Sequence, residues 1–135
     1  MRHALAHNGE APTGADYASV RTGAFMGKTI LGVAPERYLV DISPSTLMAL
    51  DARAAAAGDG GSSDGARSHL PLRVRGGAFA AEHGAHGDSV TRVEASASYA
   101  VAKPAAHPIY EHFRVRLFRQ LLEAKASTEQ VSCFY

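Results

Sequence analysis

The chain has 135 residues, a formal net charge of +1 and 46% hydrophobic residues. This length suits one domain, and the small net charge gives no electrostatic reason to expect a nucleic-acid or anionic-membrane partner. The single cysteine, Cys133, excludes an internal disulfide framework. Because no apolar run approaches the roughly 20 residues that span a bilayer, and no signal peptide opens the chain, we expect a cytoplasmic protein.

One segment near the N-terminus resembles a nucleotide phosphate loop. Gly23–Thr29 reads Gly-Ala-Phe-Met-Gly-Lys-Thr, but only three residues separate Gly23 from Gly27, where a phosphate loop has four. A buried apolar strand should also lead into such a loop, whereas the preceding residues are polar. Spacing and context therefore argue against a phosphate loop.

A helix over 16–31 fits the same segment better. Asp16 or Thr13 can serve as its N-cap, and Gly32 with Pro35 can end it. Its two glycines lie one turn apart, which suits close backbone packing. The side chains expected on one side of the helix are Tyr17, Val20, Ala24, Met26, Gly27, Ile30 and Leu31.

A second helix has a clear start signal. Ser43 is a good N-cap and Pro44 a good first helical residue. The low-complexity segment 58–68, rich in glycine and serine, follows and is predicted to be a tolerated loop insertion. The apolar face expected on this second helix consists of Leu47, Leu50 and Ala54.

The remaining segments differ in how clearly they can be assigned. Segment 70–82 fits a strand or a short helix, and 89–102 carries weak strand alternation. Segment 103–108 contains two prolines and is predicted to be a connector, whereas 109–125 gives the strongest helix pattern. The apolar stripe of that helix consists of Ile109, Phe113, Leu117, Phe118, Leu121 and Leu122.

Residue patterns for metal binding and hydrolysis are weak. His83 and His86 stand close to Asp88, but zinc requires three or four converging ligands, so solvated loop histidines are the favoured interpretation. Cys133 lies among the last residues, where a nucleophile is hard to position, and no Gly-x-Ser-x-Gly motif occurs. We therefore expect no metal ligands and no catalytic residues.

Tyr17 and Arg21 form a more interesting pair. They stand four residues apart, so a helix brings them onto one face. A tyrosine hydroxyl there can hydrogen-bond a sugar hydroxyl while its ring packs on the sugar. The alternative is a half-buried structural tyrosine beside an exposed arginine.

Five sequence blocks, taken together and in order, form a recognisable set. The first is Gly-Ala-Asp-Tyr-Ala-Ser-Val-Arg-Thr-Gly-Ala-Phe-Met-Gly-Lys at 14–28. The second is Tyr-Leu-Val-Asp-Ile-Ser-Pro-Ser at 38–45, and the others lie at 88–93, 99–104 and 107–115. No single block is specific, but the ordered set resembles the L-arabinokinases, which are grouped with galactokinase among the GHMP sugar kinases. The second block is similar to a helix start in that family.

The resemblance implies one partial domain, 1–135, of α+β class. It would be a fragment of the GHMP-kinase fold with about three main helices and a small, incomplete antiparallel sheet. The implied parent reaction moves the ATP γ-phosphate onto the anomeric hydroxyl of L-arabinose or a related monosaccharide, with Mg²⁺ as metal cofactor. The family match implies that Tyr17 contacts the sugar and that Arg21 supports it.

The departures from the family are as informative as the match. The family's glycine- and serine-rich phosphate loop is not found, nor are its catalytic aspartate and metal ligand. Phosphoryl transfer depends on positioning and charge stabilisation, so we expect this chain to be inactive alone and to bind neither ATP nor Mg²⁺. The missing kinase segments are the expected packing partner of the 109–125 stripe. The alternative is a non-catalytic sugar-binding or protein-interaction module derived from such a kinase.

Overall fold

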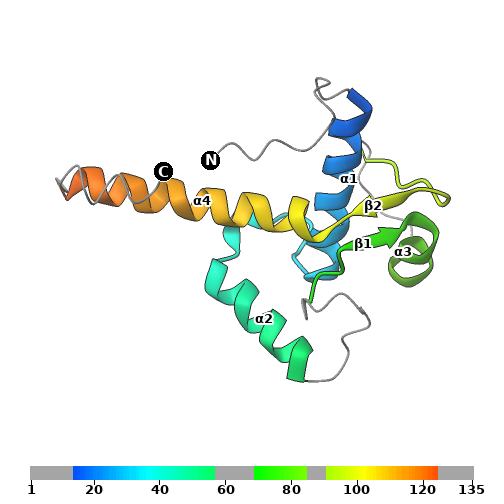
Figure 1. Ribbon diagram of the computed structural model, residues 1–135, viewed down its shortest axis with the longest axis horizontal. Helices are drawn as coiled ribbons and strands as arrows, with labels where there is room; N and C mark the ends of the chain where they lie inside the picture. Colours follow the sequence, from blue (N-terminus) through cyan, green and yellow to red (C-terminus); the bar gives the residue numbers. More distant parts are fainter. Residues whose placement is uncertain (1–13, 57–68, 85–90, 125–135) are drawn as a thin grey trace.

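The computed structural model describes residues 14–56, 69–84 and 91–124. Four α-helices and a two-stranded sheet make up this part of the chain (Figure 1), which confirms the predicted α+β class. The predictions for 58–68, His86, Asp88 and Cys133 lie outside the described residues. In chain order the elements are α1 (Gly14–Ile30), the 3-10 turn η1 (Leu39–Asp41), α2 (Pro44–Ala56), β1 (Arg73–Arg75), α3 (Gly76–His83), β2 (Ser98–Ala100) and α4 (Ala102–Glu123).

Helix α1 begins earlier than predicted and ends where predicted. Because its first residue is Gly14, Asp16 lies in the first turn and is not the N-cap, while the other predicted N-cap, Thr13, lies outside the described residues. An acidic side chain in a first turn still opposes the positive end of the helix dipole favourably. At the other end Gly32 has a φ of 66°, and the Val33 N–H donates to the Lys28 carbonyl over 3.1 Å. These features form the glycine-based C-terminal motif that satisfies the last carbonyl groups.

The two glycines of α1 allow the helix to touch the segment from β2 to α4. A Cβ placed on Gly23 would lie 1.9 Å from the Ala100 carbonyl oxygen, and one on Gly27 would lie 2.3 Å from the Ala105 Cβ. Both distances are below any normal contact, so only glycine fits at this crossing. The predicted role of the pair in close packing is confirmed.

The buried face of α1 differs from the predicted one. Its buried residues are Thr22, Gly23, Met26 and Gly27, whereas Tyr17 is 70% and Val20 43% exposed. The apolar spacing was therefore misleading in the first half of α1. Only the second half meets other described elements closely enough to be buried.

Helix α2 starts as the sequence indicates. The Ser43 hydroxyl accepts the Thr46 N–H over 3.1 Å, and Pro44 is the first helical residue. Leu47 is buried, and Leu50 is partly buried. The predicted N-cap and the first part of the predicted apolar face are thus confirmed.

The ambiguous segment 70–82 contains both a strand and a helix. β1 pairs with β2 in antiparallel register, with Val74 opposite Tyr99, and α3 follows directly from Gly76. A Cβ on Gly76 would lie 2.1 Å from the Glu94 carbonyl oxygen, so a glycine is needed where the strand turns into the helix. Each element is too short for its periodicity to dominate a sequence window, which explains why pattern alone left the choice open.

Helix α4 starts before the predicted connector. The helix spans Ala102–Glu123, so the prediction of a connector over 103–108 is wrong. Pro104 falls in the first turn, where its missing N–H would have had no acceptor within the helix. Pro108 lies inside the helix and removes one hydrogen bond there. Burial of Ala105 and Ile109 on either side of Pro108 offsets that loss.

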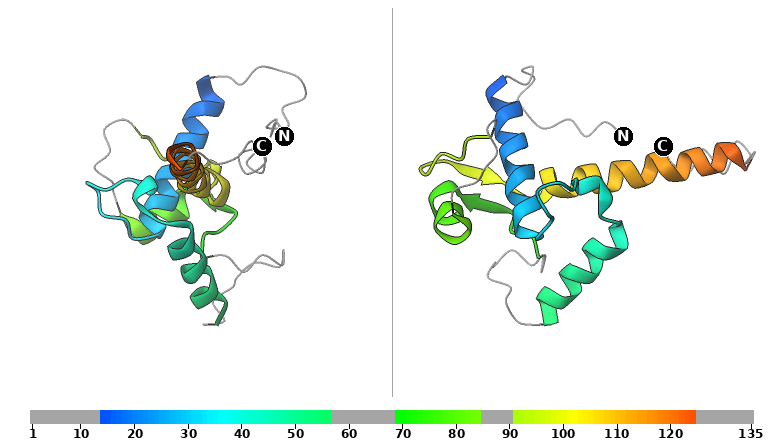
Figure 2. Two further views of the ribbon diagram at one scale, coloured as in Figure 1. Left: turned by 90° about the vertical axis from the view of Figure 1, so that its left-hand side faces the viewer. Right: turned by 180° about the vertical axis from the view of Figure 1, so that it is seen from behind.

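The core lies where α1, β2 and the first half of α4 meet (Figure 2). The Tyr99 hydroxyl is held there by accepting the Glu94 N–H over 3.0 Å. Phe79 meets Phe25 edge-on, with ring centroids 6.2 Å apart. The buried apolar side chains are Met26, Leu47, Leu70, Phe79, Tyr99, Val101, Ala105 and Ile109.

Candidate functional site

The two predicted sugar-contacting residues lie on the outer, N-terminal half of α1 (Figure 1). Tyr17 is 70% exposed and Arg21 is also exposed. Their spacing of four residues within a continuous helix places both on one side of it. The interpretation of Tyr17 as a half-buried structural residue is therefore wrong for this structure.

The second half of α1 holds this pair in place. From Thr22 onward α1 packs on β2 and α4, and the Thr22 hydroxyl donates to the Ala18 carbonyl over 2.9 Å. A helix anchored at one end presents its exposed end as a rigid extension, because the backbone hydrogen bonds run continuously through it. The positions of Tyr17 and Arg21 are thus set by the packing of residues further along α1.

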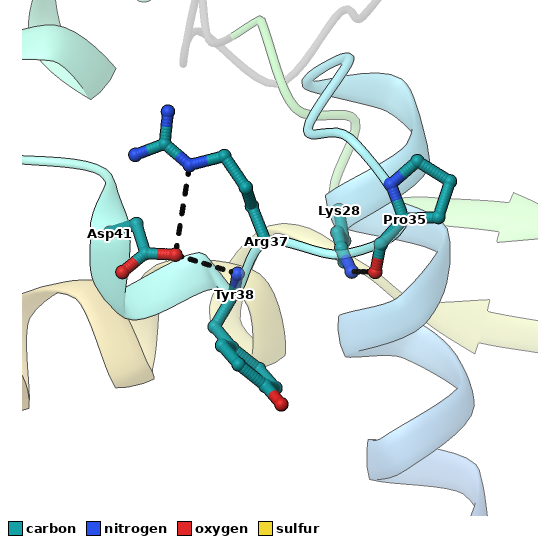
Figure 3. A network of polar contacts seen from close by, with 5 residues as sticks. All are labelled: Lys28, Pro35, Arg37, Tyr38 and Asp41. Atoms are coloured by element: carbon teal, nitrogen blue, oxygen red, sulfur yellow. Dashed lines mark hydrogen bonds and ion pairs between the residues drawn. The ribbon is translucent and has the colours of Figure 1, made fainter.

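The segment that resembles a phosphate loop is helical throughout. Gly23–Thr29 lies inside α1, so its backbone N–H groups donate to carbonyls one turn earlier and cannot surround a phosphate. The Lys28 ammonium donates to the Pro35 carbonyl over 2.8 Å (Figure 3), close to the end of the helix. The rejection of a phosphate loop on spacing is confirmed.

A polar network fixes the turn between α1 and α2 (Figure 3). The Tyr38 N–H donates to Asp41 Oδ2 over 2.8 Å, and Arg37 Nε lies 3.8 Å from the same oxygen. The Tyr38 ring is not part of this network and is 71% exposed. Asp41 thus orders η1 through the backbone, while the phenol of Tyr38 stays exposed to solvent.

Other parts of the described surface show different features. A shallow hollow lies on α4 and is lined by Arg116, Arg119, Gln120 and Glu123. Within residues 14–56, 69–84 and 91–124, no three His, Cys, Asp or Glu side chains gather closely enough to hold a metal ion. No helix in the described part of the chain is long and apolar enough to cross a membrane.

The chemistry available at Tyr17 and Arg21 is that of binding. A phenol offers one donor and one acceptor, and its ring offers an apolar face. A guanidinium adds several donors in a fixed plane. This combination suits the edge of a polyhydroxylated ligand.

The chain is similar in sequence to a plant enzyme. It is 33% identical over 151 aligned residues to an L-arabinokinase from Arabidopsis thaliana. The alignment covers 88% of this chain and 13% of that relative. No family model and no solved structure matches the chain. The chain is thus distantly related to an L-arabinokinase and spans only a small part of that relative's length.

Proposed function

We propose that this chain is part of an ATP-dependent monosaccharide 1-kinase and is inactive by itself. The parent reaction transfers the ATP γ-phosphate to the anomeric hydroxyl of L-arabinose, or of a related sugar, with Mg²⁺ as cofactor. The observation that carries the proposal is the 33% identity that extends over 88% of the chain. Resemblance to the GHMP sugar kinases is the basis for assigning the phosphotransfer chemistry.

The proposed contribution of this chain is to the sugar side of the active site. Tyr17 hydrogen-bonds a sugar hydroxyl, and Arg21 supports it from the next turn of α1. The exposure of both residues on a helix end held by the core supports this role. The helical state of Gly23–Thr29 supports the expectation that ATP and Mg²⁺ are bound by other parts of the kinase.

The test combines turnover and binding on one sample of the purified chain. We expect no phosphorylation of L-arabinose and no calorimetric signal with Mg-ATP. We expect weak sugar binding that Tyr17→Phe reduces at least threefold. Tyr38→Phe is the matched control, because Tyr38 is equally exposed but lies on the turn before α2. ATP-dependent turnover by the chain alone would overturn the proposed inactivity. Equal losses in the two tyrosine variants would overturn the role of Tyr17.

A further inference from the structure

Helix α4 changes character along its length. Its first half contributes Ala105 and Ile109 to the core, whereas none of residues 110–124 is buried. Figure 1 and the right-hand view of Figure 2 show the second half extending beyond the other described elements. Tyr110–Glu123 therefore contributes no buried residue to the core of the described chain.

The side of α4 that faces the core becomes polar in the second half. Arg116 stands seven residues after Ile109 and Gln120 eleven residues after it, so both lie within about 20° of the line through Ile109. These two residues line the shallow hollow together with Arg119 and Glu123. A simple continuation of the same packing would require apolar residues at these positions. The core-facing side of α4 therefore ends close to Ile109.

Four apolar residues of the second half, Val115, Phe118, Leu121 and Leu122, lie on a different side of α4, whereas Phe113 and Leu117 lie about 40° and 80° from Ile109. At about 100° per residue, Phe118 lies roughly 180° around the helix from Ile109. On this side Val115 is 62% and Leu122 57% exposed, and Phe118 and Leu121 are partly exposed. Arg114 lies within this side and is neutralised by its ion pair with Glu111. We call this side the outer face of α4, and it consists of Val115, Phe118, Leu121 and Leu122.

We propose that the outer face of α4 is the docking surface for a segment of the kinase polypeptide that lies outside this chain. This inference rests on the proposed function. The matched relative has about seven times more sequence beyond its aligned stretch than within it, because the alignment covers 13% of it. That additional polypeptide provides an occupant, and the outer face provides apolar area of the kind that fully folded domains bury.

A second copy of this chain is the alternative occupant, because Arg114 pairs with Glu111 and Arg119 with Glu123, so the outer face carries no excess charge. The sedimentation measurement below separates the two occupants. The segment that docks here is apolar at its centre. Because the outer face points away from the core, this segment forms a layer on the opposite side of α4 from α1.

The test uses the Arabidopsis thaliana relative with its aligned stretch replaced by this whole chain. Amide hydrogen exchange of Tyr110–Glu123 is compared between this chimera and the isolated chain. We expect exchange at least tenfold slower in the chimera. The pair Phe118→Glu and Leu122→Glu should abolish the slowing. The matched pair Arg116→Glu and Gln120→Glu, on the polar side, should retain it.

Three results would overturn the proposal. One is equal exchange in the chimera and the isolated chain. Another is that the two variant pairs lose the slowing of amide exchange in the chimera to the same extent. The third is a concentration-dependent dimer of the isolated chain, seen by sedimentation, that Phe118→Glu dissociates. If the chimera does not fold, the isolated chain is tested with a hydrophobic dye. A monomeric chain whose dye binding falls at least threefold in Phe118→Glu supports an open docking surface. Unchanged dye binding in this variant overturns the proposal.

The docking proposal and the proposed function can fail separately. Slow exchange in the chimera without phosphorylation of L-arabinose would retain the docking surface and contradict the sugar-kinase assignment. Phosphorylation with fast exchange would retain the kinase assignment and contradict the docking surface.

Discussion

The two halves of α4 belong to one helix but are stabilised in different ways. Ala102–Ile109 contains two prolines, which the helix tolerates while Ala105 and Ile109 are buried in the core. Tyr110–Glu123 has better helix-forming residues but buries none of them in the described structure. Tertiary packing therefore maintains the first half of α4, whose local helix propensity is poor. Local propensity maintains the second half, which has little packing. The comparison indicates which half can be disturbed without unfolding the domain.

The largest expected effect comes from removing a core side chain of α4. Ile109→Ala should lower the free energy of unfolding by about 3 kcal/mol, because a buried Ile or Leu replaced by Ala leaves a cavity. Ile109 is 1% exposed, whereas Val115 is 62% exposed. Val115→Ala should change stability by less than about 0.5 kcal/mol. Urea unfolding of the two variants measures this difference, and equal effects would show that both halves are packed.

The next effect concerns the contact between α1 and β2. Gly23→Ala places a methyl group against the Ala100 carbonyl oxygen, and overpacking of this kind costs about 2 kcal/mol. Alanine gains about 1 kcal/mol over glycine in helix propensity, which offsets only part of the cost of the clash. Gly14→Ala is the control, because a Cβ there meets nothing within 4 Å. Hydrogen exchange in α1 should accelerate in the first variant and stay unchanged in the second. Slower exchange in Gly23→Ala would contradict the close crossing.

A smaller effect is expected at the start of α2, which contacts α4. Ser43→Ala removes the acceptor for the Thr46 N–H and should cost about 1 kcal/mol. Ser43→Asp keeps an acceptor and should restore most of the loss. Thermal melting of the three proteins measures this order. If Ser43→Ala matched the parent protein, the cap would contribute nothing to stability.

The smallest effect is expected in the second half of α4. Arg119 Nε lies 2.7 Å from Glu123 Oε1, and both side chains are more than half exposed. Glu123→Gln should cost no more than about 0.4 kcal/mol, and the difference should decline as salt screens the pair. Urea unfolding at low and high ionic strength checks both statements. A larger, salt-independent loss would indicate that this half is packed in solution.

Local signals in the sequence determined several features of this protein. Ser43 and Pro44 identify the start of α2, and Gly32 identifies the end of α1, because caps depend on a few neighbouring atoms. The spacing of Gly23 and Gly27 was enough to reject a phosphate loop and to predict close packing. The α+β class followed from the family resemblance. Tyr17 and Arg21 were chosen by helical spacing and family resemblance, and the structure adds that both are exposed.

Tertiary structure decided the features that depend on distant residues. Pro104 and Pro108 predict a connector, yet burial of Ala105 and Ile109 extends α4 through them. Segment 70–82 becomes a strand and then a helix because β2, over twenty residues later, provides its hydrogen-bond partners. The apolar residues of 109–125 predict one stripe, but the position of α1 divides it into a buried start at Ile109 and an open outer face. Periodicity shows that a helix has an apolar side, whereas only the neighbouring elements show where along the helix that side is covered.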